Sequence, residues 1–351
     1  MRSTIKVLVV DDSALTRQLL TRALSVDPSI EIVGSAKTGV EAIEKSHQLR
    51  PDVVTLDVEM PELTGIEALP HIIRTTPARV VMLSAIDDPD TTYQALSMGA
   101  TDFIVKPHEG FASSLAELSE VLLKQIKTAY RVLPERRRVV KVPREDRTRR
   151  LGGPGKSRNA TSVERVVALA ASTGGPPALE TVFSGLSADL PAAYVVVQHL
   201  PAGFTDSLAR RLGRVTDIQV VTAEEGDRLE AGVAYIAPHG VHTLVRGRTS
   251  SRIMLEDSPS VHGVRPAADP TLRSVAAQFG PRATGVVLTG MGSDGVLGLD
   301  AIVKAGGETI AQDEASSVVW GMPGAAVRAG VASRVVPLDR MATEIRRTIR
   351  G

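Results

Sequence analysis

The sequence lacks cysteine, and its positive and negative charges nearly cancel. No cysteine occurs among its 351 residues, which excludes disulfides, zinc–thiolate sites and thiol nucleophiles. Any covalent catalysis must therefore use another side chain. The formal net charge is +1, so the whole chain has no field of one sign that would favour nucleic acid or an acidic membrane.

Long apolar runs are also missing. No run reaches the roughly 18–20 residues that a membrane helix needs. The N-terminus, "MRSTIKVLVVDDS", has an apolar run of only about five residues before two aspartates, unlike a secretory signal. A hydrophobic content of 43% and a charged content of 23% are ordinary for a globular protein of this length. We therefore expect a cytoplasmic protein that does not insert into membranes.

The first half of the chain alternates strand-like and amphipathic segments. The apolar, strand-like runs lie at 5–10, 31–36, 52–57, 79–85 and 102–107. A helical pattern follows each of them, and Ser13 is the expected cap of the first helix. Five such units predict a parallel sheet with helices on both faces, in which ligands bind at the carboxyl ends of the strands.

Polar residues gather where these strands are expected to end. They are Asp11, Asp12, Asp57, Ser84 and Lys106. Crowded carboxylates repel one another unless a hard cation lies among them, and Mg²⁺ suits such oxygen ligands. Aspartates after strands also cap helices, but five polar residues at the ends of four strands favour a binding site over capping.

These motifs resemble the receiver domain of two-component response regulators. The resemblance covers about residues 5–125 and rests on "VVDDS", "LDVEMPELTG", Ser84 and "DFIVKP". It implies a flavodoxin-like fold in which Asp57 accepts phosphate from a histidine kinase. It also implies that Asp12 and Asp57, with the backbone carbonyl of Glu59, hold Mg²⁺, while Asp11 acts mainly through water.

The resemblance also implies how phosphorylation is sensed. Lys106 and Ser84 would contact the phosphoryl oxygens, and Phe103 would be the aromatic whose rotamer reports phosphorylation. Simple core packing is the alternative for Phe103. A phosphate adds about −1.5 to −2 charges and three acceptor oxygens, which is enough to reposition a hydroxyl, a lysine and their loops.

The alternating pattern stops at about residue 131 and resumes at about 163. The stretch between is rich in arginine, proline and glycine, which predicts a flexible basic linker. A nucleic-acid-binding arm is the alternative, but interleaved aromatics and an adjoining recognition helix are missing. We therefore predict a receiver domain at 1–130, a linker at 131–162 and a second domain at 163–351.

The second half has a further α/β pattern. Strand-like runs lie at 163–171, 193–200, 284–290 and 307–313, and a hairpin is expected from 232–246 and 251–257. The pattern predicts a doubly wound domain with a mostly parallel sheet and an inserted β-hairpin. Ser172, His199 and Asp294 each come after a separate buried strand. If those strands are parallel neighbours, the three side chains share one edge of the sheet.

The stretch "VVALAASTGGPPAL" suits an exposed nucleophile. Glycines after Ser172 permit a tight turn, prolines suit the first helical turn, and the helix N-terminus favours developing negative charge. His199 would take the serine proton, and Asp294 would fix the histidine tautomer. Taken singly, the serine could belong to a cap or phosphate loop, the histidine to the surface, and the aspartate to a turn. A P-loop would need a lysine that this stretch lacks.

The second half resembles the catalytic domain of the chemotaxis protein-glutamate methylesterases over about residues 163–350. The matching stretches are "ASTGGP", "VVQHLPAGFT", "AYIAP", "RPAADP", "LTGMGSDG" and "IAQDEASSVVWGMP". The resemblance implies a Ser172–His199–Asp294 triad, with the backbone N–H groups of Thr173 and Met291 holding the oxyanion. It also places "PAGF" and Arg265 to Asp269 near the cleft. Position 170 is Ala where the family pattern often has Gly.

The resemblance further implies the reaction and its partners. The enzyme would hydrolyse glutamate methyl esters on chemoreceptors and deamidate certain glutamines, without a cofactor in the esterase site. The unphosphorylated receiver would cover the cleft, and phosphorylation would uncover it. We expect a monomer without nucleic-acid partners. The rival is a response regulator with a helical DNA-binding output module, which the alternating second half disfavours.

Overall fold

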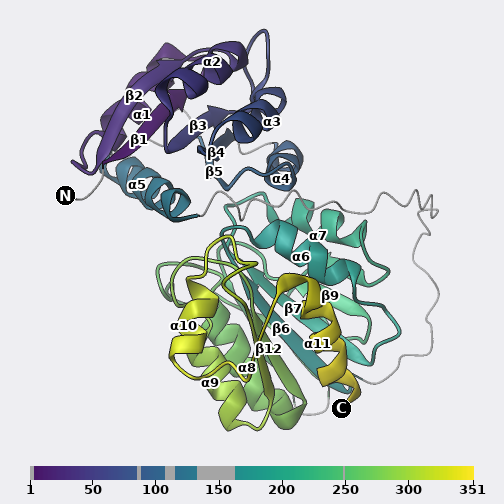
Figure 1. Ribbon diagram of the computed structural model, residues 1–351. Coiled ribbons are helices and arrows are strands. Elements are labelled where there is room, and N and C mark those ends of the chain that lie inside the picture. The colour runs from purple at the N-terminus through teal and green to yellow at the C-terminus, as the bar shows by residue number, and fades with distance from the viewer. Residues whose placement is uncertain (1–3, 85–87, 107–114, 133–162, 248–249) are drawn as a thin grey trace. The chain divides into compact units, whose positions relative to one another are not determined.

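The computed structural model describes residues 4–84, 88–106, 115–132, 163–247 and 250–351 (Figure 1). The chain divides into two compact units, Met1–Val139 and Val140–Gly351, which we describe separately. The predicted linker at 131–162 lies outside the described residues apart from its first two positions, of which Arg131 ends a helix. Within the described residues, no helix is both long and apolar enough to span a membrane.

The first unit is a five-stranded sheet in the order β2-β1-β3-β4-β5, and every pairing is parallel. The predicted fold class of this unit is thereby confirmed. Its strands are β1 (Ile5–Val10), β2 (Ile30–Ala36), β3 (Val53–Asp57), β4 (Arg79–Ser84) and β5 (Asp102–Val105). The helices that follow them are α1 (Ala14–Leu24), α2 (Gly39–Leu49), α3 (Gly65–Thr75), α4 (Pro89–Ser97) and α5 (Leu115–Arg131).

Local sequence signals start the helices of this unit. Ser13 caps α1 as predicted, and its side chain accepts a hydrogen bond from Thr16 N–H at 3.3 Å. Thr64 and Glu67 form a reciprocal capping box at the start of α3. Such caps satisfy N–H groups that have no partner inside the helix, typically stabilising it by about 1 kcal/mol each. The helices are thereby anchored at the carboxyl edge of the sheet.

The second unit is a seven-stranded sheet in the order β14-β13-β12-β6-β7-β9-β8, and its pairings are parallel. The main-sheet strands are β6 (Arg165–Ala171), β7 (Ala192–Gln198), β8 (Gln219–Thr222), β9 (Val233–Ile236), β12 (Ala283–Val287), β13 (Glu308–Gln312) and β14 (Arg334–Val336). The helices are α6 (Gly175–Ser184), α7 (Thr205–Gly213), α8 (Ala268–Phe279), α9 (Val296–Lys304), α10 (Met322–Arg328) and α11 (Leu338–Arg350).

Helices cover both faces of this sheet, as the alternating pattern predicts. One core joins alternate residues of β6 and β7 to apolar side chains of α8, α9 and α10. The opposite face carries α6, which packs beside α7 and α11 (Figure 1). There Phe183 of α6 meets Tyr194 of β7 edge to face, with ring centroids 5.9 Å apart. The strands between these layers are apolar on both sides, as buried parallel strands are.

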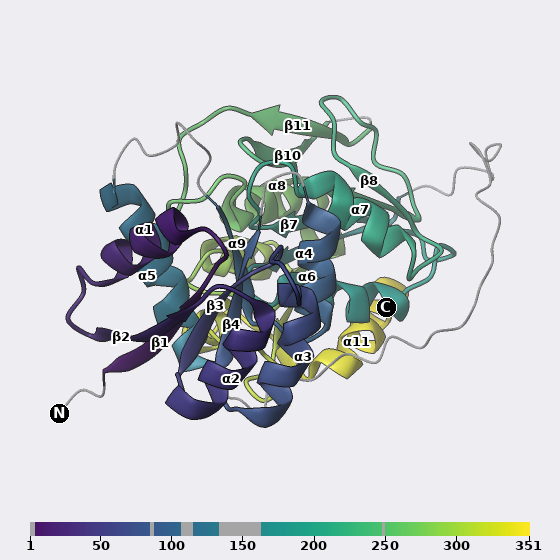
Figure 2. The ribbon, with the colours of Figure 1, turned by 90° about the horizontal axis from the view of Figure 1, so that it is seen from above.

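The hairpin prediction was partly wrong. Of the segments expected to form the hairpin, β10 (His242–Arg246) and β11 (Arg252–Glu256) pair antiparallel, and β10 packs beside α8 (Figure 2). The earlier part of the expected first strand is β9, which lies between β7 and β8 in the main sheet. All four of its residues are buried. An apolar segment buried on both faces suits the interior of a parallel sheet better than an exposed hairpin.

A carboxylate cluster and a candidate active site

The carboxyl edge of the first sheet gathers the predicted acidic residues. Ligand oxygens of Asp11, Asp12 and Asp57 lie within 4.8 Å of one another. Asp11 and Asp57 are buried, whereas Asp12 is exposed. Lys106 follows β5, and its Nζ lies 2.9 Å from Asp11 Oδ2 and 2.6 Å from Asp57 Oδ2. The lysine therefore neutralises part of the charge that the sheet brings together.

Burial perturbs the titration of this cluster. It raises the pKa of Asp57 from 3.8 to about 6, although the Lys106 ammonium opposes the rise. Burial also disfavours the charged lysine, but the bonds to Asp57 and Asp11 outweigh it and raise the pKa of Lys106. Asp57 is thus ionised at neutral pH but held in an environment that penalises its charge.

The cluster fits a small divalent cation. Asp11 Oδ2 and Asp57 Oδ2 are buried, and no described residue offers either of them a well-aligned hydrogen-bond donor, although both face the Lys106 ammonium. Carboxylate oxygens of this kind are the ligands that Mg²⁺ takes in proteins. Glu59 N–H donates to Asp57 Oδ1 at 3.3 Å, so the residue expected to offer its carbonyl is adjacent to the cluster.

The remaining predicted receiver residues lie on neighbouring strands. Ser84 is the last residue of β4, and its hydroxyl is hydrogen-bonded to that of Thr92 in α4. Phe103 is the second residue of β5 and is 7% exposed. Ser84 therefore links the carboxyl edge of the sheet to α4, while Phe103 occupies the buried position that either a switch or a core residue would take.

In the second unit, Ser172 and His199 follow the adjacent strands β6 and β7. Ser172 N–H donates to Thr289 O at 3.0 Å, which ties the turn to the segment after β12. His199 N–H donates to Ala171 O at 3.2 Å. Because β12, β6 and β7 are neighbours in the sheet, all three segments leave it at one edge, as predicted.

The chain turns sharply at Ser172. Its carbonyl accepts a hydrogen bond from Gly175 N–H at 2.7 Å, and Gly174 has φ 75° and ψ 4°. These values define a type II turn, which requires a positive φ at its third residue. A Cβ at Gly174 would also lie 2.6 Å from Val318 Cβ. Glycine is therefore required there for two reasons, and α6 begins directly after the turn.

His199 pairs with Asp294 across the edge. His199 Nε2 lies 2.9 Å from Asp294 Oδ2, and Asp294 is 2% exposed. Two backbone N–H groups at the start of α8 also donate to this carboxylate, Ala268 to Oδ2 at 2.6 Å and Asp269 to Oδ1 at 3.0 Å. Burial alone would raise the pKa of Asp294, but these donors and His199 outweigh it and lower the pKa.

The expectation that Asp294 directly follows its strand was wrong. β12 ends at Val287, and residues 288–293 separate it from Asp294. Within the described residues, the Ser172 hydroxyl and the His199 ring share no hydrogen bond. The structure thus brings His199 and Asp294 into contact and places Ser172 directly after the neighbouring strand, at the same edge of the sheet.

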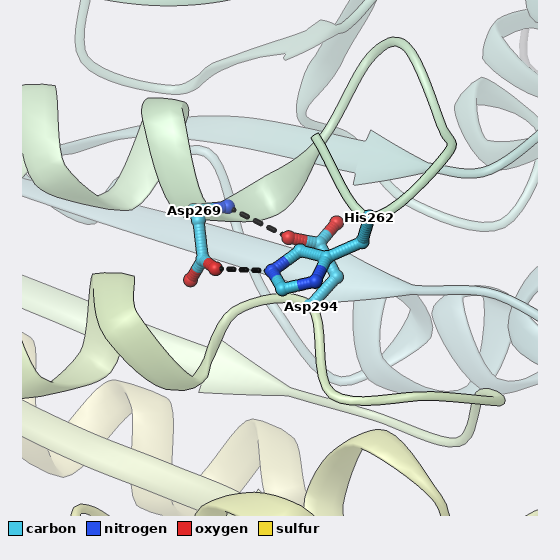
Figure 3. A group of neighbouring side chains, drawn as sticks. All are labelled: His262, Asp269 and Asp294. Carbon is cyan, nitrogen blue, oxygen red and sulfur yellow. Dashed lines mark hydrogen bonds and ion pairs between the residues drawn. The ribbon is translucent and has the colours of Figure 1, made fainter. Parts of the chain in front are cut away.

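A second histidine–aspartate pair adjoins this site, and the sequence interpretation missed it (Figure 3). His262 Nε2 lies 2.8 Å from Asp269 Oδ2, while Asp269 Oδ1 accepts from Gly298 N–H at 2.7 Å. These three groups and Asp294 form a hydrogen-bond network that joins the starts of α8 and α9. Asp269 falls in the stretch expected near the cleft. No pattern in the sequence singles out His262.

Hydrogen bonds to backbone carbonyls hold the peptide groups of both expected oxyanion donors in place. The Gly290 carbonyl shares a peptide group with Met291 N–H, and it accepts from Gly321 N–H at 3.1 Å and Met322 N–H at 2.8 Å. The Ser172 carbonyl, which shares a peptide group with Thr173 N–H, also accepts two hydrogen bonds. Both peptide groups are therefore held from their carbonyl side.

The chain matches two family models. Residues 167–345 match "CheB methylesterase", and residues 7–112 match "Response regulator receiver domain". A protein-glutamate methylesterase/protein-glutamine glutaminase of Pyrococcus horikoshii is 45% identical over 97% of this chain and 92% of its own length. One from Xanthomonas campestris pv. campestris is 43% identical, over 98% and 97%. The solved CheB methylesterase catalytic domain of Thermotoga maritima is 36% identical with a TM-score of 0.52, covering 52% of this chain and 97% of that one.

Proposed function

This chain belongs to the CheB methylesterase family and carries a response regulator receiver domain, and from this we propose that it hydrolyses glutamate methyl esters on chemoreceptors and deamidates certain of their glutamines. The observation that carries the proposal is the arrangement at one sheet edge. There the Ser172 turn neighbours a histidine that is paired with a buried carboxylate. The helical DNA-binding rival loses its basis, because the second unit is built on a parallel sheet.

Ser172 is the nucleophile of the proposed reaction. Its Oγ attacks the ester carbonyl, and His199 takes the hydroxyl proton. Because His199 Nε2 is occupied by Asp294, Nδ1 is the nitrogen that receives this proton. The protonated ring then donates it to the departing methoxide, which leaves as methanol. Water attacks the acyl-enzyme by the same route, releasing a glutamate side chain and restoring Ser172. In deamidation, ammonia leaves in place of methanol.

Asp294 holds His199 in the tautomer and orientation that a general base needs. Its lowered pKa keeps it ionised throughout the neutral range, so it accepts a hydrogen bond from His199 Nε2–H and stabilises the imidazolium that forms during attack. The N–H groups of Ala268 and Asp269 fix both of its oxygens. The carboxylate therefore cannot rotate away from His199 without breaking contacts at the start of α8.

The oxyanion forms at the start of α6. The N–H groups of Thr173 and Met291 are the proposed donors, and each one is worth about 3–4 kcal/mol where such a donor has been removed. The helix N-terminus adds positive potential at the same place. These groups stabilise charge that is present only in the tetrahedral intermediate, so their effect falls on kcat.

Asp57 is the proposed phosphoacceptor of the receiver. Its carboxylate oxygen attacks the phosphoryl group of a kinase phosphohistidine, an O–P bond forms, and the N–P bond to the kinase breaks. Asp12 and Asp57, with the Glu59 carbonyl, would hold Mg²⁺, and Asp11 would contribute through water. When bound, Mg²⁺ supplies charge that offsets the crowded carboxylate and phosphoryl oxygens. Lys106 then exchanges one carboxylate partner for a phosphoryl oxygen.

In the proposed regulation, the phosphorylation state of the receiver controls the esterase. The unphosphorylated receiver, proposed at 1–130, restricts access to the esterase site at 163–351. Phosphorylation draws Ser84 and Lys106 towards the phosphoryl group, and Phe103 moves with them. A complete reversal from 1:99 to 99:1 requires about 5.5 kcal/mol of preference for the open state. Several charge-assisted hydrogen bonds can supply much of that.

Trapping of the acyl-enzyme tests the esterase proposal. Methylated receptor is mixed with the enzyme, and the reaction is quenched in acid within one turnover. Mass spectrometry should find the receptor glutamyl group attached to the peptide that contains Ser172. Attachment elsewhere, or turnover with no adduct at any quench time, contradicts the assignment of Ser172.

A further inference from the structure

Gln198 joins the nucleophile turn to the strand that carries the base. It is the last residue of β7 and is only 3% exposed. Its Nε2 donates to Ser172 O at 3.0 Å and to His199 O at 3.1 Å. Both partners are carbonyl oxygens, so the amide NH₂ group must face them and the orientation of the amide is fixed. One buried side chain thus binds the backbone of both catalytic residues.

The Ser172 carbonyl belongs to the same peptide group as the Thr173 N–H. Among the described residues, only the Arg265–Pro266 bond is cis, so the peptide that joins Ser172 to Thr173 is trans. In a trans peptide the C=O and N–H bonds point in opposite directions. Gly175 N–H and Gln198 Nε2 both donate to this carbonyl, at 2.7 and 3.0 Å. Fixing the carbonyl therefore fixes the direction of the Thr173 N–H.

We propose that Gln198 is a positioning residue that orients the oxyanion donor of Thr173 through the Ser172 carbonyl. This inference rests on the proposed esterase function. A hydrogen bond accepted by a carbonyl also polarises its peptide group, which strengthens the N–H as a donor. Gln198 thus acts on the transition state without touching the substrate.

The surroundings of Gln198 indicate that the amide serves a purpose beyond packing. Its Oε1 is buried and has no hydrogen-bond partner among the residues that the structure describes. Such an oxygen destabilises the folded state, and an apolar side chain of similar length would avoid the penalty. The two donated hydrogen bonds explain why a glutamine suits this position despite the penalty.

Gly175 provides the space for this amide. A Cβ added at Gly175 would lie 1.9 Å from Gln198 Oε1. The two glycines of the turn therefore have different tasks. Gly174 supplies the positive φ of the turn, and Gly175 permits the close approach of Gln198. An alanine at 175 should consequently displace the amide and weaken its bond to the Ser172 carbonyl.

Two substitutions of Gln198 test the inference in the full chain. Gln198→Met removes both donors at similar length, and Gln198→Glu keeps the shape but replaces the donors by acceptors. Gln219→Glu makes the same change at the exposed first residue of β8 and serves as the control. Methanol release from methylated receptor gives kcat and KM, and thermal unfolding reports whether each variant is folded.

We expect kcat to fall about 10- to 100-fold in both Gln198 variants, less than the 100- to 1,000-fold typical of losing a donor outright. KM should stay within about twofold, because the Thr173 N–H would bind the oxyanion only in the transition state. The pH midpoint of kcat/KM should not move, since His199 keeps its partner. Gly175→Ala should lower kcat similarly. Combining it with Gln198→Met should add little, because both changes disrupt the same hydrogen bond between Gln198 and the Ser172 carbonyl.

Two results would overturn the inference. One is a kcat within about twofold of wild type in the folded Gln198→Met variant. The other is a loss confined to KM, which would indicate substrate binding or general disorder of the site. If Gln198→Glu does not fold, Gln198→Met decides the question. Ser172→Ala is measured alongside, and turnover in that variant would refute the proposed function and this inference together, whereas inactivity there isolates the test of Gln198.

Discussion

Replacing Asp57 by asparagine should stabilise the receiver unit at neutral pH in the absence of Mg²⁺. Burial raises the pKa of Asp57 from 3.8 to about 6, even against the opposing Lys106 ammonium. That rise corresponds to about 3 kcal/mol of destabilisation once the carboxyl is fully ionised. Asparagine has nearly the same shape and does not ionise, so the variant escapes most of this penalty.

The stability advantage of Asp57→Asn should increase with pH. Because the pKa is higher in the folded state, the folded protein binds more protons than the unfolded chain between about pH 4 and pH 6. Ionisation of Asp57 therefore lowers the stability of the wild type as pH rises through that window. The advantage of Asp57→Asn should grow from about 1 kcal/mol at pH 4.5 to about 3 kcal/mol at pH 7.5.

Urea-dependent hydrogen exchange, read by mass spectrometry on peptides from β1 and β3, measures this unit within the full chain. EDTA removes divalent cations. Asp12→Asn removes the same charge at an exposed neighbour and should have a much smaller effect. An advantage of Asp57→Asn that is absent at pH 7.5, or that is equal at pH 4.5 and 7.5, would refute the claim that burial governs this carboxyl.

Four further outcomes are expected. Gly174→Ala should abolish most methanol release and lower the unfolding temperature, because its Cβ would lie 2.6 Å from the Val318 side chain. The control is Gly226→Ala, where φ is a similar 83° but the surrounding space is open, and it should cause only a mild stability loss in the same thermal scan. Asp294→Asn should lower kcat about 10³- to 10⁴-fold in the receptor assay, because His199 would lose its ionised partner. Chelation of Mg²⁺ or the change Asp57→Asn should each prevent labelling by radioactive acetyl phosphate, and full labelling of the variant would reject Asp57. Deleting residues 1–150 should raise basal demethylation and remove its response to acetyl phosphate; a fragment no faster than the unphosphorylated full chain would rule out occlusion by the receiver.

The strand-end residues could be predicted from the sequence because one rule governs them. Parallel strands place their carboxyl ends at one edge, so Asp57 and Lys106 could be placed together from local patterns alone. The same rule placed Ser172 and His199 on one edge. Each of these residues lies at the end of a strand or directly after it, where sequence position and spatial position agree.

Residues in loops and in buried contacts between segments could not be predicted in this way. Asp294 lies well beyond its strand, and its partners at the start of α8 depend on how that helix packs. His262 reaches Asp269 from a turn that no periodic pattern marks. Gln198 contacts a carbonyl 26 positions away in the chain. Such contacts depend on the tertiary packing, which one-dimensional periodicity does not encode.

Methanol release from methylated receptor by Ser172→Ala tests most directly whether Ser172 is the nucleophile. The control is Ser184→Ala, which changes an exposed serine at the end of α6, the helix that begins after the Ser172 turn. We predict that Ser184→Ala retains wild-type turnover, while Ser172→Ala loses at least about 1,000-fold with its fold intact, because the members of the proposed triad would act as a unit. Residual turnover of Ser172→Ala within about tenfold of wild type, a barrier change of only about 1.4 kcal/mol, would contradict the assignment of Ser172 as the nucleophile.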